Sequence, residues 1–578
     1  MNKRPARDQW KRKKQYTAGL TAVPLLILSM LIVLPLLLIM LQSVEGPDGF
    51  HLNGLWPDTG QTNVGVLLAQ TIWLGVAVSA VSLLLAFPLA FLSARTNIGS
   101  GRWTDVLLLI PFMTPPYISS MGWVEFMQKK GFLEQMLPAA ATFTPDFFSF
   151  GGLVAIMSLQ VFPIIYLILK DTLCGIGNHM DEAASVFGAS FLYRLRRVYV
   201  PLLLPSCSVG LLLVFTKAIS EFGTPATFGL TIGYHVMTTS VYQYVSSWPV
   251  DFGKAAAISF WLMVVCLLAW RTQVVISSHF TFSLIKTKEQ YAACYQLRGW
   301  RQGLARLYIS LVFLVSVGIP YFSIITTSLL NIRGNGLHWN NLTFAHYLAA
   351  LTPHAAGLTA LESSLAISLL VAVMTVILGF LVACLLVRAQ NGWMRRAIGS
   401  VSMLPNTVPG IVLLLGMIFL WNSTWIPLHI YNTYSMVLLA YVLLFLPYAV
   451  QYAQSGITQI DHSLRDAGCL ATGRRLYVLG RIILPIAGPQ LLSAWGLIFV
   501  LSMRELVAAL LILPAGMQNA SSYIYAQFDQ GNVPDGMALT VVSVLATIIV
   551  YALVAYWLRA VISSGKNHAR RANKGVHD

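Results

Sequence analysis

The sequence predicts an all-α integral membrane protein in which twelve transmembrane helices form two parallel six-helix repeats. Three observations support this prediction: the composition is strongly apolar, the apolar residues fall into long runs, and sequence landmarks recur in the second half. Of the 578 residues, 57% are hydrophobic and 10% are charged, whereas soluble chains carry about a quarter charged residues. This composition excludes a secreted enzyme, a nucleic-acid factor and a disordered scaffold.

Twelve apolar runs of about 20 residues, the length that crosses a bilayer, mark the expected helices. The first run follows a basic head. It is too long for the core of a signal peptide and has no small-residue cleavage site, so we expect it to remain as a helix. The predicted spans are 18–42, 67–93, 104–125, 151–174, 202–222, 255–276, 303–330, 362–388, 398–421, 433–456, 487–513 and 537–561.

The positive charges predict the orientation of these helices. With the N-terminus in the cytoplasm, most of the 37 Lys and Arg residues fall in the head, in the inner loops and in the tail. Such a bias is typical of cytoplasmic segments. We therefore expect both termini inside the cell, and the net charge of +16 requires no nucleic-acid partner.

Proline landmarks recur in the second half of the chain. Pro35 in the first span corresponds to Pro320, and Pro111 and Pro115 in the third span correspond to Pro405 and Pro409. Because each unit has six spans, both enter the membrane from the same side and form parallel repeats about an axis along the membrane normal. The predicted domains are a basic cytoplasmic tail (1–17), a first unit (18–276), a cytoplasmic linker (277–302), a second unit (303–561) and a basic cytoplasmic tail (562–578).

The inner loop after the fourth span, residues 175–201, carries the most specific motif. Glu182-Ala183-Ala184 is followed by Gly188 and then by Pro201. Small alanines let a short helix lie close to another protein, glycine allows the left-handed turn that ends a helix, and proline suits the first turn of the next helix. The alternative is an amphipathic loop whose basic residues touch anionic lipid. These basic residues are Arg194, Arg196 and Arg197.

The corresponding loop of the second unit, residues 457–485, carries a weaker copy of the motif. In order, its residues at the motif positions are Asp466, Ala467, Gly468, Thr472 and Pro485. A β-branched residue is unfavourable at positive φ. We therefore expect the turn to shift from Thr472 to Gly473.

Both loops resemble the EAA loop of ATP-binding-cassette (ABC) importer permeases, which has these residues at this spacing. The resemblance implies the type I ABC importer permease fold and loops that dock on ATPase subunits, with the degraded second copy coupling less firmly than the first. The phosphate-binding pattern G-x-x-x-x-G-K-[ST] does not occur in the chain. ATP and Mg are therefore expected on two copies of a separate ABC ATPase, and this chain is expected to be no enzyme and to hold no cofactor.

Four of the charged residues in the spans lie in the fifth and the eleventh; charges within a membrane are costly and often functional. Lys217 and Glu221 lie in the fifth span, Arg504 and Glu505 lie in the eleventh, and Glu221 aligns with Glu505. Two carboxylates beside the axis suit a substrate path for a cationic or metal-bearing cargo. Alternatively, the charges neutralise each other within the protein. The spacing of the outer-loop histidines predicts no metal site in this chain.

The run from Glu221 to Ala226, with Ser502 to Leu506 in the second unit, is similar to the ferric-iron branch of these permeases. The resemblance implies the translocation subunit of an ATP-driven importer in a bacterial inner membrane, which receives ferric iron from a periplasmic or lipid-anchored binding protein and works by alternating access. Thiamine, polyamine and aminoethylphosphonate are alternative cargoes. A secondary transporter of the major-facilitator type is more remote, because the loop Arg95–Arg102 lacks its signature.

Overall fold

The computed structural model describes residues 23–46, 49–57, 63–98, 102–176, 183–184, 186–279, 295–389, 391–473 and 475–574. The predicted tail 1–17, Glu182 and most of the predicted linker 277–302 lie outside the described residues.

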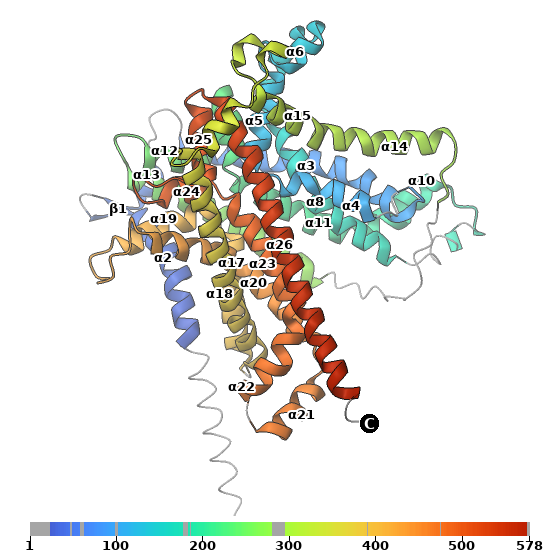
Figure 1. Ribbon diagram of the computed structural model, residues 1–578, viewed down its shortest axis with the longest axis vertical. Coiled ribbons are helices and arrows are strands. Elements are labelled where there is room, and N and C mark those ends of the chain that lie inside the picture. The colour runs from blue at the N-terminus through green and yellow to red at the C-terminus, as the bar shows by residue number, and fades with distance from the viewer. Residues whose placement is uncertain are drawn as a thin grey trace, which may run out of the picture.

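The described part of the first unit is built almost entirely of helices (Figure 1). Its main helical elements are η1 (Ser29–Val33), α2 (Leu34–Gln42), α3 (Val64–Arg95), α4 (Arg102–Met113), α5 (Pro116–Met127), α8 (Phe150–Gly175), α10 (Phe191–Arg194), η4 (Leu195–Tyr199), α11 (Val200–Ser220), η5 (Pro225–Gly229), α12 (Met237–Ser246) and α13 (Phe252–His279). The connections hold a two-residue ladder and short helices, namely β1 (Glu45–Gly46), β2 (Gly49–Phe50), η2 (Leu52–Leu55), α6 (Phe132–Met136), η3 (Pro138–Thr142), α7 (Thr144–Phe147) and η6 (Leu230–Ile232).

The second unit repeats this order of elements. Its main helical elements are α14 (Trp300–Phe313), η7 (Leu314–Gly318), α15 (Ile319–Leu329), α17 (Ala356–Arg388), α18 (Gly392–Thr407), α19 (Gly410–Trp421), α20 (Tyr434–Thr458), α21 (His462–Thr472), α22 (Arg475–Val478), η10 (Leu479–Ile483), α23 (Leu484–Met503), α24 (Val507–Ile512), α25 (Ala520–Asp529) and α26 (Val533–Lys574). Short helices in one connection are η8 (Arg333–Asn335), η9 (Trp339–Asn341) and α16 (Ala345–Leu351).

Ten helices of the described residues are long and apolar enough to cross a membrane, and they match ten of the twelve predicted spans. The third and ninth spans, predicted as continuous helices, are both broken. Pro115 is extended between α4 and α5, and Pro409 is extended where α18 meets α19 at a bend of 109°. Proline and its preceding residue disfavour helical continuation, so the repeated prolines break both spans at corresponding places.

Four wide helical turns precede prolines at repeated positions. In η1, η4, η7 and η10 the closing hydrogen bond spans five residues instead of four. Proline has no N–H to continue the ordinary ladder, and a widened turn accommodates the missing donor. The prolines that follow are Pro35, Pro201, Pro320 and Pro485. Pro201 lies at the start of α11 as predicted, but the helix runs back through η4 to Phe191.

The first transmembrane helix of each unit packs against the broken helix of the other unit. α2 contacts α19, and α15 contacts α5. A Cβ added to Gly122 would lie 2.8 Å from the carbonyl oxygen of Pro320, and one added to Gly416 would lie 2.5 Å from that of Pro35. Glycine therefore permits both close approaches, as small residues do where membrane helices cross. The two units are joined by an exchange of equivalent helices.

We call the contacts of α2 with α19 and of α15 with α5 the junction. Away from it, the long helices of each unit pack mainly with one another. α3, α8 and α11 pack together in the first unit, and α17, α20 and α23 pack together in the second. Figure 1 shows α10 near the end of one group and α21 with α22 at the end of the other, well apart. The largest cluster of buried apolar side chains lies at the junction and draws on both units, including Tyr117, Ile324 and Val412.

Candidate functional site

A cavity of about 240 Å³ lies between the two units. Its wall includes all four charged residues that the sequence places in the fifth and eleventh spans, namely Lys217, Glu221, Arg504 and Glu505. Folding thus brings together two pairs of charges that are nearly 300 residues apart in the chain. Their role as a substrate path remains a prediction.

Helix ends surround this cavity. α11 ends at Ser220 and α23 ends at Met503, while α5 and α19 begin beside the cavity at Pro116 and Gly410. The end of α11 at Ser220 agrees with the predicted end of the fifth span at residue 222. The prediction of a continuous eleventh span to residue 513 is wrong, because the chain leaves the helix at Arg504 and resumes it in α24. Backbone groups freed at such breaks need partners inside a membrane protein.

The two carboxylates accept hydrogen bonds from the backbone at equivalent breaks. Glu221 Oε1 accepts from the N–H of Gly223 at 2.7 Å, and Oε2 accepts from the N–H of Thr224 at 2.9 Å. In the second unit Glu505 Oε1 accepts from the N–H of Ala508 at 3.4 Å. Each glutamate therefore caps the start of the segment that follows its own helix break.

The two cations reach across the junction to the opposite unit. Lys217 Nζ donates to Asn406 Oδ1 at 3.2 Å, and Tyr448 donates its hydroxyl to the same oxygen at 3.3 Å. Arg504 Nη1 donates to the carbonyl oxygen of Phe112 at 2.6 Å, and its guanidinium lies 5.6 Å from the centre of the Phe112 ring. Phe112 and Asn406 occupy corresponding places, at the ends of α4 and α18 before the repeated breaks.

The four charges were expected either to line a substrate path or to neutralise each other. Among the described residues, none of the four forms an ion pair with another, so Lys217 and Glu221 do not neutralise each other in a direct pair despite their spacing on α11. The carboxylates instead have the structural role of helix caps. Both cations border the cavity, and each makes one hydrogen bond within the described part of the chain.

Sequence reasoning missed the acceptors of these cations. Asn406 follows Pro405 in the ninth predicted span, and a polar amide in an apolar run beside a repeated proline was the available signal. Phe112 had no such signal, because it contributes its backbone carbonyl. The residue four positions later is Pro116, which has no N–H to bond that carbonyl, so an outside donor is needed.

The first inner loop places its motif residues at the end of the first group of helices. Ala183 and Ala184 lie in a short helical stretch that ends at Gly188, whose φ of 71° is the left-handed conformation predicted for it. Val186 and Phe187 between them are 85% and 90% exposed. Glycine adopts this turn without the steric penalty of a side chain.

The second inner loop forms the longer helix α21, which contains Asp466, Ala467 and Gly468. Thr472 is helical and donates its hydroxyl to the carbonyl oxygen of Gly468 at 2.8 Å. The left-handed turn lies at Gly473, with φ 61°, as predicted. Leu470, at the position that corresponds to Val186, is 87% exposed. Pro485 begins α23 after η10. The roles of both loops in coupling remain predictions.

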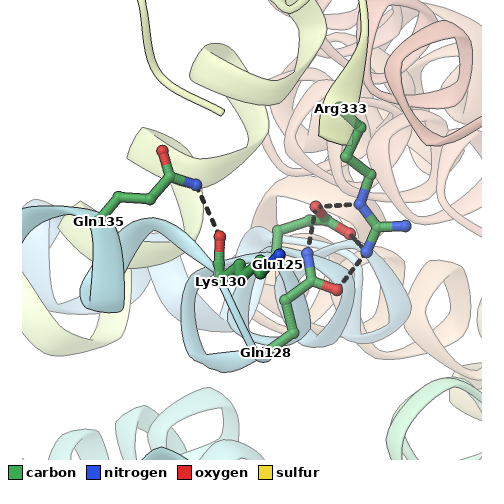
Figure 2. Close-up of polar contacts among 5 residues, drawn as sticks. All are labelled: Glu125, Gln128, Lys130, Gln135 and Arg333. Atoms are coloured by element: carbon green, nitrogen blue, oxygen red, sulfur yellow. Dashed lines mark hydrogen bonds and ion pairs between the residues drawn. The ribbon is translucent and has the colours of Figure 1, made fainter. Parts of the chain in front are cut away.

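A polar cluster joins the two units on the side away from α21 (Figures 1 and 2). Arg333 Nε donates to Glu125 Oε2 at 2.9 Å, and Nη2 lies 2.8 Å from Oε1. Gln128 bonds both partners. Gln135 Nε2 donates to the carbonyl oxygen of Lys130 at 2.7 Å, and Gln135 Oε1 accepts from a backbone N–H of the Arg333 loop at 2.7 Å. The buried Glu125 carboxylate thus ties α5 to the segment after α15.

Comparison with known proteins shows what this chain is similar to. Residues 375–567 match the family of binding-protein-dependent transport system inner membrane components. A ferric transport system permease protein of Actinobacillus pleuropneumoniae is 23% identical over 570 residues, which cover 95% of this chain and 79% of that protein. A Fe(3+)-transport system permease protein of Haemophilus influenzae is 24% identical over 470 residues, which cover 79% of this chain and 83% of that protein.

A shorter relative matches half of the chain. A protein of Salmonella choleraesuis named as a 2-aminoethylphosphonate transport system permease is 28% identical over 257 residues, which cover 44% of this chain and 95% of that protein. Less than half of this chain is thus enough to match nearly all of that relative. This is expected if the chain consists of two fused units.

Proposed function

We propose that this chain is a fused two-unit permease of binding-protein-dependent transport, and that it is the translocation subunit of an ABC importer that brings ferric iron across a bacterial inner membrane. The observation that carries this proposal is the position of the charged cavity. It lies at the junction of two repeated units whose far ends carry the EAA-like loops. The similarity to ferric transport permeases over nearly the whole chain supports iron as the cargo.

The family implies two kinds of partner, a substrate-binding protein and an ATPase. We assign one ATPase copy to each inner loop, because the exposed apolar residues Val186 and Leu470 occupy corresponding places on the two loops. ATP and Mg bind on those subunits. The binding protein, periplasmic or lipid-anchored, delivers cargo on the opposite side, where the Glu125–Arg333 cluster joins the units. Both chain termini are then cytoplasmic.

The packing offers a mechanism for alternating access. When the ATPase copies approach each other, they draw together the two groups of helices that end in α10 and α21. The exchanged helices α2 and α15 link each unit to the broken helix of the other, so this movement reaches the cavity directly. The contacts of Lys217 with Asn406 and of Arg504 with Phe112 cross the moving junction and would be remade in each cycle.

Aminoethylphosphonate is the second candidate cargo, favoured by the shorter Salmonella relative. Thiamine and polyamine remain alternatives from sequence resemblance. The experiment is uptake in cells that lack the chain and are complemented with it, together with its ATPase and binding protein. We expect ATP-dependent accumulation of radioactive iron. Accumulation of labelled aminoethylphosphonate without iron would replace the iron assignment, and uptake that survives ATP depletion but collapses with an ionophore would reject the ABC mechanism.

A further inference from the structure

We propose that the cavity between the units binds an oxyanion, held between Lys217 and Arg504. This inference rests on the proposed function and specifies its cargo: the transported species presents a phosphate, phosphonate or carboxylate group to these two residues. A ferric ion would therefore cross as a complex with an oxyanion ligand, not as a bare cation.

The carboxylates are poorly placed to act as metal ligands. Both oxygens of Glu221 accept backbone N–H groups at 2.7 and 2.9 Å, and Glu505 accepts from Ala508. Coordination of a cation by these oxygens would compete with their capping of the two segments after the helix breaks. Their negative charge still borders the cavity and weakens the binding of an anion, which suits a path that must release its cargo.

The two cations have donors to spare. The Lys217 ammonium has three N–H donors and the Arg504 guanidinium has five, and within the described residues each makes one hydrogen bond. Neither forms an ion pair there. A planar guanidinium binds phosphate-like and carboxylate groups through two parallel hydrogen bonds. Because the two residues belong to different units, an oxyanion between them would contact both halves of the transporter.

Two helix N-termini add donors to the same cavity. α5 and α19 are twelve residues long, both begin at the cavity wall, and neither has a side chain capping its first turn. Pro116 and Tyr117 of α5 and Gly410 and Ile411 of α19 line the cavity. Pro116 has no N–H, so the donors here are the backbone N–H groups of Tyr117, Gly410 and Ile411. Uncapped N–H groups and the positive end of the helix dipole favour an anion. The four helix starts around the cavity thus divide into two capped by glutamate and two open.

The repeat itself supplies the test variants. Lys217 corresponds to Leu501 and Arg504 corresponds to Ser220, so Lys217→Leu installs the residue that the other unit carries. Arg504→Gln removes the second charge, and Arg504→Lys retains it. Lys254→Leu is the matched control, since Lys254 lies outside the cavity and pairs with Asp251.

Binding of inorganic phosphate to the full chain in lipid nanodiscs is measured by calorimetry. We expect Lys217→Leu and Arg504→Gln to weaken phosphate binding about tenfold each, as for the loss of one charge-assisted interaction. Arg504→Lys keeps the charge but loses the paired hydrogen bonds, so it should weaken binding less than Arg504→Gln, and Lys254→Leu should bind like the original. Unchanged binding in both Lys217→Leu and Arg504→Gln, with the proteins folded by thermal melting, would overturn the inference, as would phosphate binding too weak to detect in the unaltered chain.

Uptake by the complete transporter separates this inference from the proposed function. One arm supplies radioactive iron with phosphate or citrate, and the other supplies labelled aminoethylphosphonate without iron. Activity lost in Lys217→Leu in either arm supports an oxyanion cargo and shows which source provides it. Iron uptake at full rate in both charge-removing variants refutes the inference and leaves the importer assignment standing. Failure of the unaltered chain in all arms rejects the importer assignment, while phosphate binding in nanodiscs still decides the site.

Discussion

Arg504 of the second unit donates a 2.6 Å hydrogen bond to the carbonyl oxygen of Phe112 in the first unit. Pro116, four residues after Phe112, has no N–H to serve that carbonyl. A helix break in one unit is therefore satisfied by a charged side chain at the helix break of the other. Through this bond, the helix break in the third predicted span holds the Arg504 side chain at the cavity wall.

Replacement of Arg504 by Ala should destabilise the junction. The Phe112 carbonyl would lose its donor in a membrane-embedded site, which costs about 1–3 kcal/mol. Arg504→Lys keeps a donor and should lose less stability. Thermal unfolding in detergent measures both variants. Equal unfolding temperatures for Arg504→Ala and the unaltered chain would show that another group serves this carbonyl.

Substitutions at the two glycines that face the exchanged helices should have matching effects. Gly122→Ala forces a methyl group against the Pro320 backbone, and Gly416→Ala forces one against Pro35. Overpacking of this kind costs about 1–3 kcal/mol, so each variant should lower the unfolding temperature and the rate of uptake.

Gly303→Ala in α14 is the control for these variants, because nothing lies within 4 Å of its added Cβ. A helical glycine replaced by alanine gains about 0.5–1 kcal/mol, so this protein should unfold at an equal or higher temperature. Comparable losses in the control and in Gly122→Ala would contradict the close-approach argument.

The two inner loops should respond differently to valine. Gly188 has φ 71° and Thr472 is helical. Gly188→Val strains the left-handed turn, whereas Thr472→Val replaces one β-branched residue with another. We expect ATP hydrolysis stimulated by the loaded binding protein to fall much further in Gly188→Val.

Gly473→Val provides an internal comparison, because Gly473 has φ 61° in the second loop. It should behave like Gly188→Val if both turns contribute to coupling. Equal damage from Gly188→Val and Thr472→Val would defeat the idea that the two loops couple unequally to the ATPase.

The exposed apolar residues of the inner loops should hold the ATPase. Val186→Asp and Leu470→Asp alter side chains that are 85% and 87% exposed, so the fold of the chain should be unaffected. Burying a charge in an apolar interface is unfavourable, and each variant should retain fewer ATPase copies on purification. Full retention of two copies by the double variant would place the ATPase contact elsewhere.

The outer cluster offers a double-mutant cycle. Glu125 has a side chain only 2% exposed beside Arg333. Removing its partner in Arg333→Met leaves a buried charge, which costs about 3 kcal/mol, and adding Glu125→Gln should recover much of the loss. Thermal unfolding of the two single variants and the double variant measures this coupling. If the losses of the two single variants simply added in the double variant, Glu125 and Arg333 would not be coupled, and the hydrogen bond from Gln128 would be enough to stabilise the carboxylate.

The sequence predicted a helical membrane protein and most of its spans because hydropathy and charge bias are properties of short segments. It also placed the turns at Gly188 and Gly473, since only local backbone sterics decide them. The breaks at Pro115 and Pro409 were missed although both prolines were recognised as a repeated pair, because a proline in an apolar run can kink a helix or divide it, and the packing around it decides which.

What the sequence determined by itself is a twofold repeated, helical membrane protein with two unequal inner loops, because the period of the repeat and the spacing of the motif can be read directly along the chain. Only the tertiary structure decided how the charges are used. Glu221 and Glu505 cap helix starts, while Lys217 and Arg504 reach the opposite unit. These partners lie far apart in the chain, and two helix breaks and an exchange of helices between the units bring them together.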